Sequence, residues 1–169
     1  MIKKLLLLAL VALPMSVAAQ TIKLGHFKSS DVLQGMPEFT QAQNELNKQA
    51  QMHDEEYKRI TGEYQKTLEE FVNAQDSLPQ NIAERRQKEL QDMAQKVQEY
   101  AQFADQDLSQ LQKKLMEPII LKVNNAVKAV GDAEGMTYIF DLSTTTIPYV
   151  NDKVSIDLTA AIKSKLGAQ

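Results

Sequence analysis

The chain has 169 residues, no Cys, no Trp, 6 Gly and 5 Pro, and a formal net charge of -3 at pH 7. The absence of Cys excludes a disulfide-stapled scaffold, a Cys-ligated zinc or iron–sulfur protein and a thiol enzyme. Two His residues are too few for a His-rich metal site. Aromatic residues make up only 6% of the sequence, which is little core material for one compact domain and points to an elongated part.

The first 19 residues have the pattern of a secretory signal peptide. Lys3 and Lys4 form a basic start, an apolar run follows over 5–13, and small residues at 17–19 precede a cleavage site. The apolar run is too short to cross a hydrocarbon layer of about 30 Å. We therefore predict an exported, soluble chain that begins at Gln20. No Cys is present to carry a lipid anchor.

Residues 38–117 have a composition typical of long exposed helices. They contain 15 Gln, 16 acidic and 10 basic residues, but only one Gly and one Pro. Apolar residues recur every three or four positions in two series, which the turn-forming segment 76–81 separates. The first series is Phe39, Ala42, Leu46, Ala50, Tyr57, Ile60, Tyr64, Leu68 and Phe71, and the second is Leu90, Met93, Val97, Tyr100, Ala104, Leu108, Leu111 and Leu115. Each series predicts an amphipathic helix with one narrow apolar seam.

The two seams can face each other in an antiparallel hairpin. In such a hairpin the numbers of facing residues have a constant sum, and seven pairs, from Leu68–Leu90 to Ala42–Leu115, add up to 157 or 158. One of these pairs places His53 opposite Ala104. We predict an antiparallel coiled-coil arm, on the order of 60 Å long at about 1.5 Å per helical residue.

The flanks of the arm, 20–37 and 118–169, are predicted to form one small β-rich body, so that the fold class is α+β. Gly131 and Gly135 are helix-stop signals downstream of the arm. Short strands are expected at 22–27, 137–141, 147–150 and 154–156. A body of about 70 residues with open sheet edges and no disulfide should gain stability by oligomerising.

Capping residues delimit the predicted helices of the body. Ser29 or Ser30 is expected to cap a one-turn helix that ends at Gly35. Pro37 is placed to open the first long helix, and Asp157 to cap a final helix.

No catalytic, metal or cofactor site is predicted. Signatures of phosphate-binding loops, nucleophile elbows and zinc hydrolases do not occur in the sequence. His26 lies in an expected strand and His53 in the arm seam, so we interpret both as structural. Neighbouring carboxylates such as Glu55 and Glu56 point in different directions from a helix and lie on a solvated face. We therefore do not expect an enzyme.

Apolar residues outside the two seams are candidate contacts with another protein. Met52 and Phe103 lie at the same level of the predicted hairpin, whereas Val72, Leu78 and Ile82 cluster toward its tip. The alternative is that these side chains widen the seam or cap the tip.

Two residues are candidate hinges of the arm. Gly62 lies in the middle of the first helix, and Pro118 lies at the base of the second. Both residue types favour local bending of a helix. The alternative at each position is an ordinary helix irregularity.

Several motifs outside the arm are more specific than the arm itself. They are Ser-Ser-Asp-Val-Leu at 29–33 after the first strand, Tyr-Ile-Phe-Asp at 138–141, Ile-Pro-Tyr at 147–149 and Val-Ser-Ile-Asp-Leu-Thr at 154–159. Together with the signal peptide and the long helical hairpin, they give a sequence that resembles the Skp/OmpH family of periplasmic chaperones. The resemblance extends over essentially the whole mature chain.

The resemblance implies a homotrimer in the periplasm of a Gram-negative envelope. In such a trimer the strands form a central barrel, and three arms surround a cavity that holds unfolded outer-membrane proteins before their insertion. A holdase of this kind works without ATP or another cofactor.

Charge separates this chain from strongly basic members of that family. The mature chain has a net charge of -5, with -6 in residues 38–117 and +1 in the body. The acidic arm argues against contact with an anionic membrane or lipopolysaccharide. No nucleic-acid partner is expected.

A second hypothesis comes from a different functional class. The protein could be a structural adaptor that docks onto another envelope protein through its hairpin tip. Such an adaptor requires a specific tip, so replacing Leu78 and Ile82 by Ser should abolish its function. A holdase should lose only a little of its function after the same replacements.

Overall fold

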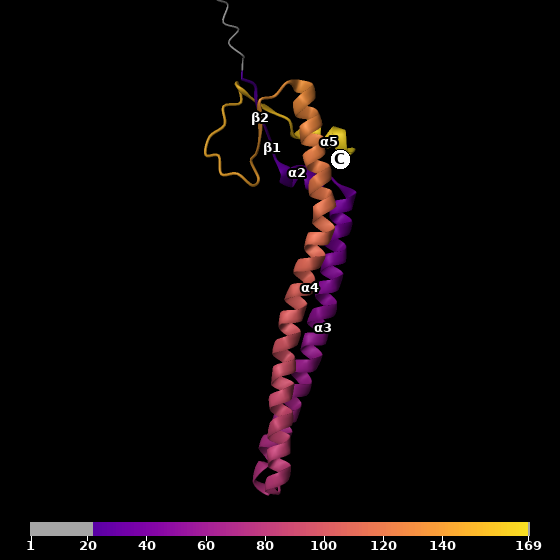
Figure 1. Cartoon of the computed structure of the whole chain (residues 1–169), viewed down its shortest axis with the longest axis vertical. Helices are drawn as coiled ribbons and strands as arrows, with labels where there is room; N and C mark the ends of the chain where they lie inside the picture. The colour runs from indigo at the N-terminus through magenta and orange to yellow at the C-terminus, as the bar shows by residue number, and fades with distance from the viewer. Residues whose placement is uncertain (1–21, 169) are drawn as a thin grey trace, which may run out of the picture.

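The chain forms a long two-helix arm with a small body at one end (Figure 1). The computed structural model describes residues 22–168, so the predicted signal peptide lies outside the described residues. The elements of the body and arm follow in this order. They are β1 (Leu24–Phe27), α2 (Ser29–Gln34), α3 (Pro37–Ala74), the 3-10 turn η1 (Gln75–Ser77), α4 (Gln80–Glu134), β2 (Tyr138–Asp141), β3 (Ser155–Asp157) and α5 (Thr159–Leu166). The predicted α+β class with a long helical hairpin is confirmed.

The arm consists of α3, with 38 residues, and the first part of α4, which has 55 residues. Pro37 is the first residue of α3, as predicted, because a first-turn residue needs no backbone N–H partner. Helix α4 continues through Pro118 into the body and ends at Gly135, whose φ of 65° closes the helix in the left-handed region. The second helix is therefore much longer than the predicted seam, which ended near residue 117.

Side-chain contacts between α3 and α4 agree with the predicted antiparallel register. Near the base, Glu38 forms an ion pair with Lys122. In the middle, Gln49 Nε2 donates a hydrogen bond to Asp107 Oδ2 at 3.1 Å. Near the tip, Phe71 and Arg86 line the same small hollow.

The body contains one parallel sheet with the strand order β2-β1-β3. Gly25 in the central strand is in register with Ile139 on one side and Ile156 on the other. The strand predicted at 147–150 is wrong, because this segment belongs to the irregular connection between β2 and β3. Both sides of β1 are already paired, the segment does not pair with the outer edge of β2 or β3, and Pro148 has no N–H to donate to a ladder.

One face of the sheet packs against helices and forms the core. The buried core residues are Phe27, Val32, Met36, Ala42, Ile119, Val123, Ala126, Val130, Leu158 and Ile162. A Cβ at Gly25 would lie 2.7 Å from Leu158 Cδ1, and a Cβ at Gly131 would lie 2.9 Å from Ile139 Cδ1. The prediction that Gly131 stops the helix is therefore wrong. Gly131 lies inside α4 and allows this helix to approach the sheet closely.

The start of α2 is capped from outside the helix. The residue preceding α2 is Lys28, and it makes no side-chain cap, so neither Ser29 nor Ser30 is the predicted N-cap. Instead, Asp141 Oδ1 accepts a hydrogen bond from the Ser29 N–H at 3.1 Å, and Ser143 Oγ accepts one from the Ser30 N–H at 3.1 Å. The end of β2 thus fixes the position of α2.

The final helix is capped nearly as predicted. Leu158 precedes α5 and is the formal N-cap residue. Asp157 Oδ1 accepts a hydrogen bond from the Thr159 N–H at 2.9 Å. Its carboxylate therefore satisfies a free donor of the first turn from one position further back.

The Asp141 carboxylate should make the stability of the body depend on pH. It also accepts hydrogen bonds from the Ser143 N–H at 2.9 Å and from Thr144 Oγ1 at 3.0 Å. Burial alone would raise the pKa of Asp141, but the hydrogen bonds from Ser29, Ser143 and Thr144 outweigh it and hold the pKa below its usual range. The resulting stabilisation is present above the unfolded-state pKa and is lost as the pH falls through the folded-state pKa.

We expect Asp141→Ala to lower the free energy of unfolding by about 1 to 2 kcal/mol at pH 7, because it removes a helix-capping carboxylate. The difference from the wild type should be smaller at about pH 3, below the unfolded-state pKa of about 3.9, because the stabilisation is lost progressively as the pH falls toward the lower folded-state pKa. Urea denaturation at both pH values measures this difference. Asp152→Ala, which changes an exposed loop carboxylate, is the control and should have little effect. A difference for Asp141→Ala that is constant across this pH range would contradict the prediction.

Candidate functional site

A polar layer interrupts the apolar seam in the middle of the arm. His53 of α3 is only 8% exposed. Its Nδ1 lies 2.9 Å from the Tyr100 hydroxyl, and its Nε2 lies 3.0 Å from Asp107 Oδ2. Since a carboxylate only accepts, Nε2–H donates to Asp107 and, in the neutral ring, Nδ1 accepts from Tyr100. The buried imidazole is therefore fully hydrogen-bonded, as its structural interpretation requires.

Carboxylates set the electrostatic environment of this polar layer. The hydrogen bond from His53 outweighs the opposing effect of desolvation and holds the pKa of Asp107 below its usual range, and a hydrogen bond from Gln49 lowers it further. Asp107 is therefore ionised at neutral pH. Burial raises the pKa of the Tyr100 hydroxyl, and the nearby carboxylates of Glu56 and Asp107 add to this effect. The layer thus lies in a negative environment.

The rings of His53, Tyr100 and Phe103 pack against one another in edge-to-face and tilted arrangements. The centroid of His53 lies 5.8 Å from that of Tyr100 and 5.8 Å from that of Phe103. Tyr100 and Phe103 are 6.0 Å apart. These are the tilted and edge-to-face geometries that aromatic rings prefer. The ring of Phe103 is therefore held in place although much of it faces solvent.

Met52 and Phe103 form an exposed apolar pair above the polar layer. Met52 is 54% exposed and Phe103 is 55% exposed. Each precedes a seam residue, His53 or Ala104, by one position, so in an antiparallel hairpin both lie on the same side. We call Met52 and Phe103 the mid-arm patch. By this register, two of the five predicted contact residues lie on one side of the arm, and their role as contacts stays a prediction.

The other three predicted contact residues lie near the hairpin tip in different environments. Val72 is 60% exposed. Leu78 and Ile82 are half-buried, and Leu78 lines a small hollow with Phe71 and Ala74. Val72 is thus available to a partner, whereas Leu78 closes the end of the hairpin.

Both hinge candidates lie inside uninterrupted helices. Gly62 is in the middle of α3, where an added Cβ would meet nothing within 4 Å. Pro118 is inside α4, at the level where the arm joins the body. Bending at either residue stays a prediction.

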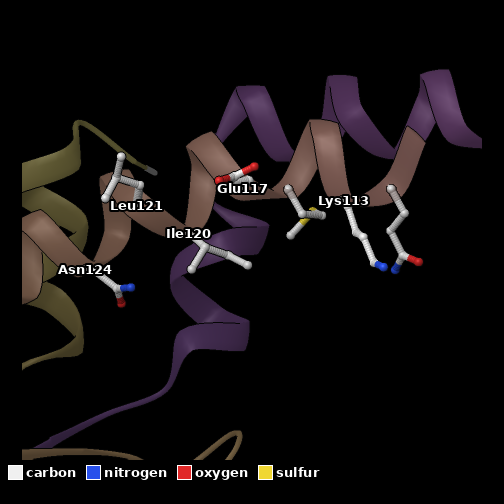
Figure 2. Close-up of a pocket in the computed structure, with 7 residues that line it drawn as sticks. Lys113, Glu117, Ile120, Leu121 and Asn124 are labelled. Atoms are coloured by element: carbon white, nitrogen blue, oxygen red, sulfur yellow. The ribbon is translucent and has the colours of Figure 1, made fainter. Parts of the chain in front are cut away.

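An apolar surface at the base of the arm was not among the predicted contact residues. Ile120 is 48% exposed and Leu121 is 60% exposed, and they lie on α4 beside Lys113, Glu117 and Asn124 (Figure 2). All residues that line this basal groove belong to α4. The helical period of the sequence could have revealed this surface, since it directs Ile119 into the core and the next two residues outward.

The second face of the sheet carries further exposed rings. Tyr138 and Phe140 stack with their centroids 6.2 Å apart and are both exposed. His26 lies on the same face, where its Nδ1 is 2.8 Å from Ser155 Oγ. It is buried and contributes to a hollow beneath the connection from β2 to β3, which includes exposed Tyr149. His26 is thus a packed residue of the body.

The described residues, 22–168, contain no group of three or more His, Asp or Glu side chains placed to hold a metal ion. Within the same range, no helix is both long enough and apolar enough to span a membrane.

The architecture defines a class of α+β protein in which a long helical hairpin projects from a small body that contains the sheet. One solved structure with this architecture is the crystal structure of a protein from Caulobacter crescentus CB15, described as an outer membrane chaperone (OmpH-like). The two share 15% sequence identity with a TM-score of 0.68, and the match covers 86% of this chain and 83% of the other. At this identity the likeness shows the fold alone. No curated protein sequence matches the chain.

The family is shown by the sequence itself. The pattern of the outer membrane protein (OmpH-like) family matches residues 23–166, which include the whole arm and nearly all of the body. The chain therefore belongs to the OmpH-like family. This confirms the resemblance seen in the sequence motifs.

We expect the Tyr100 hydroxyl to stabilise the arm, because its removal leaves a buried imidazole nitrogen without a donor. Tyr100→Phe should lower the free energy of unfolding by about 1 kcal/mol in urea denaturation. Tyr57→Phe is the matched control, since Tyr57 is 41% exposed and should tolerate the loss of its hydroxyl. Equal stability changes in the two variants would contradict a structural role for the His53 layer.

Proposed function

We propose that the protein is an ATP-independent holdase chaperone of the periplasm. It would bind unfolded outer-membrane β-barrel proteins between helical arms and prevent their aggregation before membrane insertion. The observation that carries this proposal is a long, polar arm that exposes separate apolar side chains, Met52, Phe103 and Val72, along its length. Membership of the OmpH-like family supports it, as does the description of the Caulobacter protein as an outer membrane chaperone.

The physical task of such a holdase fits this surface. An unfolded barrel protein exposes alternating apolar residues that it cannot bury before it reaches a bilayer. Several weak contacts from more than one arm would give avidity without a single tight site. The sequence has no nucleotide-binding motif, so release would come from folding of the client rather than from hydrolysis. The protein would not be an enzyme.

The proposal includes assembly into a homotrimer. In the sheet, β1 lies between β2 and β3, so β2 and β3 each have one unpaired outer edge. Exposed apolar residues lie beside these edges and on the basal groove; they are Ile120, Leu121, Tyr138, Phe140, Tyr149, Val154 and Ile156. Burial of these side chains between subunits would stabilise a body whose described residues form three short strands.

The proposed division of labour follows the chain. Residues 20–37 and 118–169 would form the oligomerisation body, and residues 38–117 the arm. Gly62 and Pro118 would let the arms adapt to clients of different size. Residues 1–19 would direct export and then be cleaved off, so that the chaperone would act in the envelope of a Gram-negative cell. The acidic arm disfavours anionic lipid or lipopolysaccharide as a partner.

A light-scattering assay tests the holdase activity. A urea-unfolded outer-membrane barrel protein is diluted into buffer with a several-fold molar excess of the mature protein, and turbidity is recorded. We expect slower aggregation than in buffer alone. Met52→Ser combined with Phe103→Ser should weaken this protection. Unchanged aggregation with the wild type at this excess would contradict the proposal.

The same assay separates the holdase from an adaptor that docks by its tip. Val72 is a better test residue than Leu78 or Ile82, because it is exposed and its replacement should not disturb the end of the hairpin. Val72→Ser should reduce protection only slightly if contacts are spread along the arm. Complete loss of function in this variant would favour a specific tip site.

A further inference from the structure

The net charge of the arm is concentrated at the level of the mid-arm patch. Residues 49–57 and 99–107 face each other in the hairpin and contain six carboxylates, but no Lys or Arg. The rest of residues 38–117 has ten acidic and ten basic residues. The six carboxylates are Asp54, Glu55, Glu56, Glu99, Asp105 and Asp107. We call these two facing segments the acidic band.

Only part of this charge is neutralised by neighbouring residues. Lys58 Nζ lies 2.6 Å from Asp54 Oδ2, and Arg59 binds both carboxylate oxygens of Glu56. Among the described residues, Glu55, Glu99 and Asp105 form no ion pair with Lys or Arg. Asp107 bonds to His53 and Gln49 rather than to a permanent cation. The acidic band therefore keeps an excess of negative charge.

This uncompensated charge surrounds Phe103. Glu99 lies one helical turn before Phe103 on α4, and Asp107 lies one turn after it. Both are exposed enough to reach solvent, as is the ring between them. An apolar group bracketed by carboxylates attracts a different ligand from an apolar group on a neutral surface.

We propose that the mid-arm patch docks client segments in which an aromatic or large aliphatic side chain is flanked by Lys or Arg. Met52 and Phe103 would cover the apolar side chain, with the flexible thioether of Met52 adapting to its shape. Glu99 and Asp107 would pair with the flanking cations, which can also lie over the ring of Phe103. The inference rests on the proposed chaperone function for its class of partner, an unfolded chain.

The polar layer beneath the patch gives it a fixed form. The ring of Phe103 packs edge-to-face with His53 and at a tilt with Tyr100, and His53 is hydrogen-bonded to both Tyr100 and Asp107. Phe103 is therefore held outward and does not have to be ordered when a client binds. A contact surface that is ordered beforehand loses less entropy on binding.

The test compares three fluorescent peptides of equal length with the full mature protein in anisotropy titrations. The first alternates Lys with Phe, the second alternates Glu with Phe, and the third alternates Lys with Ser. We expect the Lys–Phe peptide to bind about tenfold more tightly than either of the others, and we expect its binding to weaken in high salt. Equal binding of the Lys–Phe and Glu–Phe peptides would overturn the inference.

Variants of the patch localise the binding. Phe103→Ser should lower the affinity for the Lys–Phe peptide about tenfold. The double change Glu99→Gln with Asp107→Asn should lower it by a similar factor. Phe103→Leu should keep most of the affinity, because it retains an apolar side chain. Glu69→Gln with Glu70→Gln removes two exposed carboxylates outside the acidic band and is the control. Circular dichroism checks that each variant is folded, and the same loss in the control would overturn the inference.

The aggregation assay on the same preparations separates this inference from the proposed function. Protection of a barrel protein without preference for the Lys–Phe peptide would overturn the docking specificity and leave the holdase function standing. Preference for the Lys–Phe peptide without protection would support the docking site but contradict the holdase function.

Discussion

One stripe of mostly apolar residues on α4 joins the two parts of the molecule. From Leu90 to Leu115 this stripe packs against α3, and from Ile119 to Val130 it forms much of the core of the body. Because the same helix serves both, the arm cannot change direction relative to the sheet without bending α4. The reach of the arm and the stability of the body therefore depend on a single element.

This arrangement leaves little interior for chemistry and much surface for contact. The body buries one face of a three-stranded sheet, while its other face and both edges carry exposed apolar residues. The arm buries one narrow seam and exposes the rest. Two kinds of surface result: apolar edges suited to copies of the same chain, and isolated apolar groups on a charged arm suited to weak contact with a client. The mid-arm patch is distinctive among the latter because a hydrogen-bonded layer supports it.

The arm could be predicted from the sequence because its determinants are local and periodic. Helix spacing and the constant sum of facing residues gave the hairpin register, and the contacts of His53 with Tyr100 and Asp107 agree with it. The hydrogen bonds of His53 could not be predicted, since they depend on how side chains meet across two helices.

The body was predicted less accurately because its details are tertiary. The segment 147–150 has strand-like composition, but it belongs to the irregular connection between β2 and β3 and pairs with no strand of the sheet. Gly131 resembles a helix stop, yet it serves close packing against Ile139. The cap of α2 comes from Asp141, more than a hundred residues away. None of these partners is adjacent in the sequence.

The most direct test of the account is the mass of the mature protein in solution, measured by light scattering alone and after mixing with a urea-diluted outer-membrane barrel protein. The account predicts three chains per particle alone, and a larger particle of three chains plus client after mixing. A monomer that does not co-elute with the client would contradict both the assembly through the open sheet and the holding of clients between arms.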